Sequence, residues 1–261
     1  MPWTLSHPAA VLPFRRWSPR PLSLAALVIG SMTPDVGYHI RRFDLSAFQH
    51  TLRGSFVACL PIGLLLMLLF YLCCRPVCHA LPSPHRQALL PLCPPFPSRI
   101  SAFLSILVSL LLGILTHNFC DAFTHEHGWF VDRIPWLQQR LGQIGPTTVY
   151  MFLFLQELST VVGFAIVVIA YWLWLRRQPV KPAAEISADG WRYLFWSVIV
   201  FLAFALSLPA AIHYAVATGL HNFVFVGSIL FRTAIYSSAI AVPLTLIGAW
   251  IVYVQRNNSI S

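Results

Sequence analysis

The strongest chemical signal in the sequence is a polar run that closes one of its apolar segments. His117 and Asp121 are four positions apart in this run, and His125 follows after four more. On a helix, residues four apart lie on one face, so His117 and Asp121 can bind the same ion through an imidazole nitrogen and a carboxylate oxygen. His125 continues that stripe about 12 Å from His117, so these two histidines share an ion only if the helix breaks between them. The alternative is a polar helix end whose histidines sit in the membrane interface.

The composition places these residues in a membrane protein. Of the 261 residues, 57% are hydrophobic and 10% charged, with a mean hydropathy of +0.71, whereas a globular domain carries about 25% charged residues. A soluble enzyme, a disordered chain and a secreted disulfide scaffold are therefore excluded. The net charge of +9 would suggest a nucleic-acid partner for a soluble protein, but here the basic residues alternate with apolar runs. We expect membrane lipids as partners and no nucleic acid, and the oligomeric state stays open.

The apolar runs predict the fold. A spanning helix needs about 20 mostly apolar residues, and five segments meet this requirement: residues 55–74, 101–123, 148–175, 193–218 and about 233–254. Residues 1–33 are predicted to form an N-terminal helical hairpin. Its first helix covers residues 6–16, a turn follows at residues 18–21, and the second helix runs from that turn to residue 32. The prediction is a single-domain, all-α, polytopic helical membrane protein.

Two connecting segments are predicted to lack regular structure. Residues 75–100 are rich in proline, which forbids regular helix and favours an extended cytoplasmic loop. Residues 176–191 resemble a short flexible cytoplasmic linker.

The distribution of Lys and Arg predicts the orientation, because cytoplasmic loops are enriched in these residues. Counted over the predicted loops, eleven fall on one side of the membrane, and five fall on the other: Arg41, Arg42, Arg53, Arg133 and Arg140. The side with eleven is predicted to be cytoplasmic. Asp35 then maps outward together with eight of the ten histidines, namely His7, His39, His50, His117, His125, His127, His213 and His221. A common site on the outer face is the economical explanation.

Several short motifs resemble those of known families. Thr4-x-Ser6-His7-Pro8-Ala9 and Gly30-Ser31-Met32-x-Pro34-Asp35 are similar to the opening of an uncharacterised bacterial integral-membrane family, a domain of unknown function, and this likeness runs through most of the chain. More distantly, Pro34-Asp35, His50-Thr51 and Gly113-x-x-x-His117-x-x-x-Asp121-x-x-Thr124 resemble motifs of bacterial inner-membrane metal-dependent hydrolases. Those hydrolases are in turn similar to zinc-dependent phospholipase C.

The resemblance implies a helical metal cluster with ligand positions at His7, Asp35, His50, His117 and Asp121, to which the helical stripe adds His125. Asp35, His50, His117 and Asp121 supply two nitrogens and two oxygens, a set that zinc accepts, with water in an open position. The chain departs from the hydrolases at Gly37, where they usually carry a second Asp, and no histidine has Glu four residues later. These departures favour one or two ions over a three-metal site.

Charged residues elsewhere offer further roles. Glu126 and Glu157 are candidate general bases, and Glu157 has the alternative role of a buried structural partner for Arg232. Arg232 and Arg53 are candidates for binding a phosphate group bidentately, with interfacial anchoring as the alternative for each.

These expectations combine into one functional prediction. The chain is expected to be a metal-dependent hydrolase of the bacterial inner membrane, with a divalent metal, zinc, as cofactor and a phosphoester or lipid-like ester as substrate. The alternatives are a metal-binding or transport protein without hydrolase activity, and a structural membrane protein. Cys73, Cys74 and Cys78 cluster at the cytoplasmic end of one segment, where acylation, weak metal binding and no role are all open.

Overall fold

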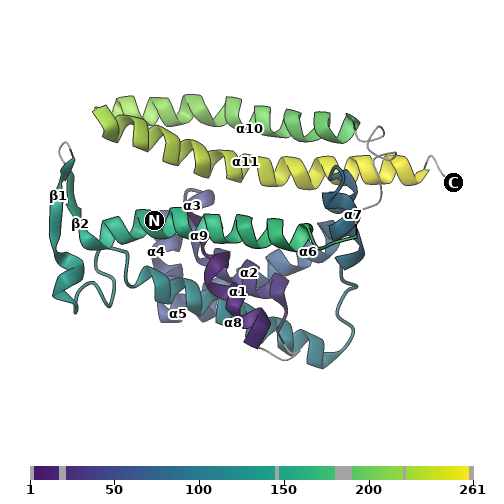
Figure 1. Cartoon of the computed structure of the whole chain (residues 1–261), viewed down its shortest axis with the longest axis horizontal. Coiled ribbons are helices and arrows are strands. Elements are labelled where there is room, and N and C mark those ends of the chain that lie inside the picture. Colours follow the sequence, from purple (N-terminus) through teal and green to yellow (C-terminus); the bar gives the residue numbers. More distant parts are fainter. Residues whose placement is uncertain (1–2, 18–21, 145–146, 180–189, 220–221, 259–261) are drawn as a thin grey trace. The chain divides into compact units, whose positions relative to one another are not determined.

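A computed structural model describes residues 3–17, 22–144, 147–179, 190–219 and 222–258. The described chain is predominantly helical (Figure 1), and its one small sheet joins two short strands. The predicted all-α class is confirmed. The elements that lead to the first long helix are η1 (Thr4–Ser6), α1 (Pro8–Trp17), α2 (Leu24–Met32), η2 (Thr33–Asp35), α3 (Val36–His39), α4 (Phe43–Gln49), α5 (Leu52–Gly54) and the π-helical turn η3 (Ser55–Cys59).

Five helical stretches within the described residues are long and apolar enough to cross a membrane: Leu52–Ala80, Ile100–Asp121, Met151–Leu175, Gly190–Ala217 and Phe225–Gln255. Each overlaps one of the five predicted segments. The agreement follows from apolar length, since a helix of about 20 apolar residues is long enough to span the hydrocarbon layer. The fold is therefore that of a polytopic helical membrane protein. The last stretch begins eight residues before the predicted segment, within the longer apolar run from Asn222 that forms α11 (Asn222–Asn258).

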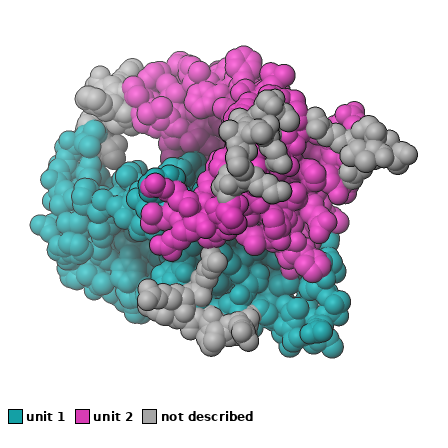
Figure 2. All heavy atoms as spheres, turned by 45° about the vertical axis from the view of Figure 1, so that its right-hand side comes forward, with its two compact units in different colours: residues 1–68, 96–172 teal, residues 69–95, 173–261 magenta. Residues whose placement is uncertain are grey.

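The chain forms two compact units (Figure 2). Unit 1 comprises residues 1–68 and 96–172, and unit 2 comprises residues 69–95 and 173–261. Helix α6 (Leu60–Ala80) contributes to both, because the division falls between Leu68 and Leu69. The two units are built differently, since unit 1 combines the long helices α8 (Ile100–Asp121) and most of α9 (Met151–Leu175) with many short helices, whereas unit 2 is built mainly on two long helices.

In unit 1, α2 packs closely against α8 (Ile100–Asp121) through two glycines. A Cβ atom at Gly30 would collide with the Leu110 carbonyl oxygen, and one at Gly113 would meet the Leu27 carbonyl oxygen and lie 2.7 Å from the Ser31 nitrogen. Small residues allow membrane helices to approach at backbone distance. The predicted N-terminal helices α1 and α2 are present, and the predicted turn at 18–21 lies outside the described residues.

We expect Gly113→Ala to destabilise unit 1 by about 1–3 kcal/mol, because the added methyl group overpacks the contact between α2 and α8. The measurement is thermal unfolding in detergent. Gly227→Ala in α11 is the matched control, since a Cβ there meets nothing within 4 Å. Equal stability of the two variants would contradict the close approach.

Between α8 and α9 (Met151–Leu175), the chain forms structure that the sequence did not predict. A 3-10 helix, η5 (Pro135–Gln138), precedes an antiparallel hairpin of β1 (Arg140–Ile144) and β2 (Thr147–Tyr150). A small core of Val131, Leu137 and Phe152 holds this segment to the start of α9. The sequence does not predict these two strands because no alternating pattern of apolar and polar residues marks them.

Unit 2 consists of the end of α6, α7 (His85–Leu89), η4 (Leu90–Leu92), α10 (Gly190–Ala217) and α11, with α10 and α11 packed side by side (Figure 1). The prediction that residues 75–100 lack regular helix is wrong, because α6 continues through Pro76 to Ala80 and α7 begins just after Pro84. Proline is tolerated at a helix start, as at Pro84, because its missing N–H has no intrahelical partner there. Pro76 lies inside α6, where it removes one backbone hydrogen bond without ending the helix. Most of the predicted linker at 176–191 lies outside the described residues.

Candidate metal centre

Four predicted ligands converge in unit 1 from three parts of the chain. Asp35 ends η2, His50 follows α4, and His117 and Asp121 lie one turn apart at the end of α8. One ligand atom from each of these residues lies within 4.8 Å of the others. Asp35 and His117 are almost fully enclosed.

The distances among these atoms match a tetrahedral ion site. The Nε2 atoms of His50 and His117 are 3.2 Å apart, and each is 3.2 Å from Asp121 Oδ2. Each is also 3.6 Å from Asp35 Oδ1. Ligands about 2.0 Å from a tetrahedral zinc ion lie about 3.3 Å from one another. Five of the six distances among the four ligand atoms, from 3.2 to 3.6 Å, therefore suit a single tetrahedral ion.

Backbone carbonyls fix the orientation of both imidazoles. His117 Nδ1 donates to the Ser31 carbonyl oxygen at 2.7 Å, and His50 Nδ1 donates to the Ser46 carbonyl oxygen at 2.7 Å. A carbonyl oxygen only accepts, so the proton of each neutral ring resides on Nδ1 and the Nε2 lone pair points inward. This arrangement is the usual outer support of metal-binding histidines.

Buried polar atoms without hydrogen-bond partners gather at the same place. Among the described residues they include Asp35 Oδ1, both carboxylate oxygens of Asp121, His7 Nε2 and His125 Nε2. Burying a polar group without a partner costs free energy, and burying a charge costs more. A cation between these atoms would satisfy the inward-facing oxygens and nitrogens together, so the residues present fit a divalent metal.

Two polar residues that the sequence analysis missed support the ligands. Thr4 Oγ1 donates to Asp35 Oδ2 at 2.7 Å, which leaves Oδ1 facing the cluster. Gln49 accepts from the Gly37 N–H at 3.1 Å and donates to the Thr33 carbonyl oxygen at 3.2 Å, so it ties α4 to the turn that carries Asp35. Gln49 is next to His50 in sequence, and that adjacency is the one signal that could have revealed it.

We expect Thr4→Val to lower metal affinity by about 10-fold to 100-fold, because the Asp35 carboxylate loses the hydrogen bond that orients it. Thr4→Ser keeps the hydroxyl and is expected to restore most of the affinity. Competition with a chromogenic chelator measures both variants. Equal affinities for valine and serine at this position would show that the hydroxyl has no such role.

Without a bound ion, electrostatics in the cluster favour a protonated His50 and a neutral His7. Burial lowers the pKa of His50, but hydrogen bonds with Asp121 and Asp35 outweigh it and raise that pKa to about 10. Burial raises the pKa of Asp35, but His117 and the hydrogen bond with His50 outweigh it, so the pKa is lowered. Burial and then the neighbouring His117 lower the pKa of His7 to about 3, which leaves its imidazole free to act as a ligand.

His7 and His125 border the four-residue cluster. His7 Nε2 is 3.6 Å from Asp121 Oδ1, and its ring stacks on His117 with centroids 3.7 Å apart. His125 Nδ1 is 3.6 Å from Asp121 Oδ2. α8 ends at Asp121, so the helix breaks before His125 and the chain turns back toward the cluster. This break meets the condition stated in the sequence analysis, where His117 and His125 could share one ion only if the helix broke between them.

The remaining predicted site residues lie outside the cluster. Arg53, Glu126 and Glu157 are exposed in unit 1. Arg232 lies in unit 2, where its guanidinium is 3.2 Å from the centroid of the Tyr214 ring and its Nη1 donates to the Tyr236 hydroxyl at 3.3 Å. The roles of these four residues as bases or phosphate ligands rest on the sequence alone.

The fold and the cluster define a polytopic helical membrane protein with a candidate metal centre at the end of a spanning helix. The chain belongs to the family described as Domain of unknown function (DUF4184), which matches residues 1–253. No curated protein and no solved structure matches it. Membership of an uncharacterised family is thereby confirmed, and the more distant likeness to hydrolases stays a prediction.

Proposed function

We propose that this protein is a metal-dependent hydrolase of the bacterial inner membrane, with its site on the extracytoplasmic face and a phosphoester or lipid-like ester as substrate. The observation that carries the proposal is the set of inward-facing lone pairs of Asp35, His50, His117 and Asp121. Two imidazoles with two carboxylates form a donor set that zinc accepts. A bound divalent ion supplies Lewis-acid polarisation and makes water more acidic.

Solvent reaches the cluster along one side. The side chains of His50 and His125 are 18% and 26% exposed, whereas those of His7, Asp35, His117 and Asp121 are at most 5% exposed. Water and the polar part of a substrate would therefore enter past His50 and His125. The buried residues exclude water from the opposite side, which strengthens electrostatic interactions within the cluster.

Asp121 can serve two positions at once. Its Oδ2 faces His50 and His117, and its Oδ1 faces His7. One or two ions are therefore consistent with the available ligands. With one ion, His7 stays neutral and free to hydrogen-bond a substrate.

An apolar pocket beside His7 supports a lipid-like substrate. Its volume is about 410 Å³, and its lining includes His7, Ala10 and Cys120 together with Val162 and Ile166 of α9. Pockets of about 300–1,000 Å³ accommodate small molecules. Val162 and Ile166 lie about 17–23 Å along α9 from its start, so the pocket reaches toward the middle of a spanning helix. An acyl chain would fill the pocket while its ester lies at the cluster.

The N-terminal segment forms one wall of this pocket because it is fixed to α9. The Trp3 backbone N–H donates to Thr160 Oγ1 at 3.1 Å, and a Cβ at Gly163 would lie 2.9 Å from the Ser6 carbonyl oxygen. This contact holds His7 between the pocket and the cluster.

A structural metal site is the second candidate function. Four protein ligands complete a tetrahedral zinc site, as in metal centres that only stabilise a fold. On this alternative the ion would tie η2, α4 and α8 together without chemistry.

Metal analysis combined with a hydrolase screen separates the two candidates. Full-length protein in detergent is assayed for bound zinc, manganese and iron, and then for hydrolysis of phosphomonoesters, phosphodiesters and phospholipids. Bound metal with hydrolysis that a chelator abolishes supports the hydrolase. Bound metal without any hydrolysis, and with unfolding on chelation, supports the structural site. Failure to bind any of these metals would contradict both.

A further inference from the structure

Unit 2 contains its own group of potential ligands, the thiols of Cys74, Cys78 and Cys93. Cys74 and Cys78 are one turn apart on α6, and Cys93 directly follows η4. The three Sγ atoms all lie within 4.8 Å of one another, and those of Cys74 and Cys93 are 2.8 Å apart. Cys78 and Cys93 are buried and Cys74 is half-buried. The fold therefore gathers three soft ligands that are distant in sequence.

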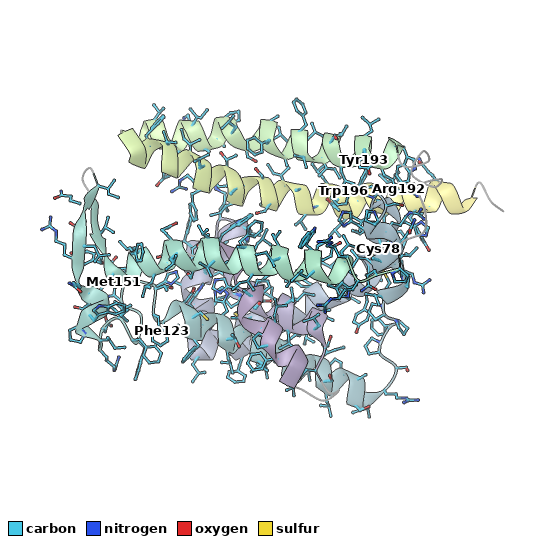
Figure 3. The ribbon with its side chains drawn as sticks, in the orientation of Figure 1. Cys78, Phe123, Met151, Arg192, Tyr193 and Trp196 are labelled. Atoms are coloured by element: carbon cyan, nitrogen blue, oxygen red, sulfur yellow. The ribbon has the colours of Figure 1, made fainter. Side chains whose placement is uncertain are left out.

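The backbone that carries these thiols is fixed by contacts within unit 2 (Figure 3). Arg192 Nε donates to the His79 carbonyl oxygen at 3.0 Å, and Trp196 Nε1 donates to the Ala80 carbonyl oxygen at 2.9 Å. These bonds hold the end of α6 against α10. In the segment that carries the third thiol, Pro91 and Pro94 lie on either side of Cys93 and restrict the backbone there. The ligand positions are thus held before any ion binds.

The chemistry of the group favours a thiophilic ion. Soft thiolate ligands select zinc and copper(I) over magnesium, calcium and manganese. The neighbouring His79 is not part of the group, and its ring faces Tyr253, with centroids 5.3 Å apart. Among the described residues, the candidate group therefore contains sulfur ligands alone. Three sulfurs suit a three-coordinate ion, or zinc with water as its fourth ligand at the half-buried Cys74 side.

We propose that Cys74, Cys78 and Cys93 bind one thiophilic metal ion, zinc or copper(I), as three thiolates. Binding releases the three thiol protons to solvent and requires no redox step. Two thiolates about 2.3 Å from one ion lie about 3.8 Å apart, so Cys74 and Cys93 separate by about 1 Å through side-chain rotation. In the orientation proposed above, the group lies on the cytoplasmic side, where thiols stay reduced.

The test uses full-length protein in detergent, kept reduced and free of oxygen. His117→Ala serves as the background, because it removes one of the four ligands of the unit 1 cluster, weakens metal binding there, and leaves the residues of unit 2 unchanged. Zinc and copper(I) are added separately and quantified after gel filtration, and cobalt(II) is added to detect thiolate-to-metal charge-transfer absorption. Cys93→Ser is compared with Cys73→Ser, whose buried thiol lies next to Cys74 but outside the group.

The expected result is about one equivalent of zinc or copper(I) in the background protein, with cobalt charge-transfer bands. Cys93→Ser should lose the bound metal and the cobalt bands, and Cys73→Ser should keep the bound metal and the cobalt bands. Absence of the bands and of bound metal in the background protein would overturn the proposal, as would a disulfide between Cys74 and Cys93 in protein kept reduced. If Cys93→Ser does not fold, the cobalt bands of the background protein decide the matter. Neither result depends on hydrolase activity.

Discussion

His117→Ala is expected to reduce metal affinity of the candidate centre by about 100-fold or more and to bring hydrolysis to background. Changes in groups that merely orient a ligand already cost about 10-fold to 100-fold. This variant removes a ligand atom that lies 3.2 Å from both His50 Nε2 and Asp121 Oδ2. Bound metal is measured by elemental analysis and hydrolysis on whichever ester the screen identifies.

The control for this prediction is His127→Ala, since the His127 side chain is 86% exposed. We expect it to keep the metal and the activity of the unmodified chain. Because the His117 side chain is fully buried, its removal leaves a cavity, so gel filtration and thermal unfolding must show that the variant is folded. A folded His117→Ala variant with undiminished metal would exclude this cluster as the centre.

Ala10→Trp is expected to reduce kcat/KM for long-chain phospholipids by roughly tenfold or more, and to change hydrolysis of a short-chain ester much less. Ala10 lines the apolar pocket beside His7, so an indole there occupies space that an acyl chain would use. The metal ligands are untouched, and bound metal should stay at the level of the unmodified chain. The measurement is the ratio of the two kcat/KM values in mixed micelles.

Ala165→Trp is the matched control for the pocket prediction. Ala165 is exposed on α9 and is not among the residues that line the pocket. We expect this variant to hydrolyse both substrates at the rate of the unmodified chain. An equal loss for long and short substrates in Ala10→Trp would show that the pocket does not select the chain length.

Predictions from local pattern succeeded where one segment alone decides the structure. The five spanning stretches follow from apolar length, whichever residues they pack against. The same reasoning failed at residues 75–100, because proline content says little about where helices start. Pro84 stands immediately before α7, and Pro91 lies in the first turn of η4.

The candidate centre shows the same division. His117 and Asp121 could be paired from sequence because four residues make one helical turn. Asp35 and His50 came from a resemblance, and tertiary packing alone brings their segments to the end of α8. Gly30 and Gly113 let α2 approach α8, and Gln49 ties α4 to the turn that carries Asp35.

The sequence by itself determined the membrane class, the spanning segments and the kinds of ligand available, because these depend on composition and on short-range spacing. Tertiary structure alone decided which lone pairs face inward, since His117 and His50 are oriented by the carbonyl oxygens of Ser31 and Ser46. It also decided the pocket beside His7 and the approach of Cys93 to Cys74. Every residue carries a backbone carbonyl, so residue type cannot reveal such partners, and contacts between distant segments depend on how the whole chain packs.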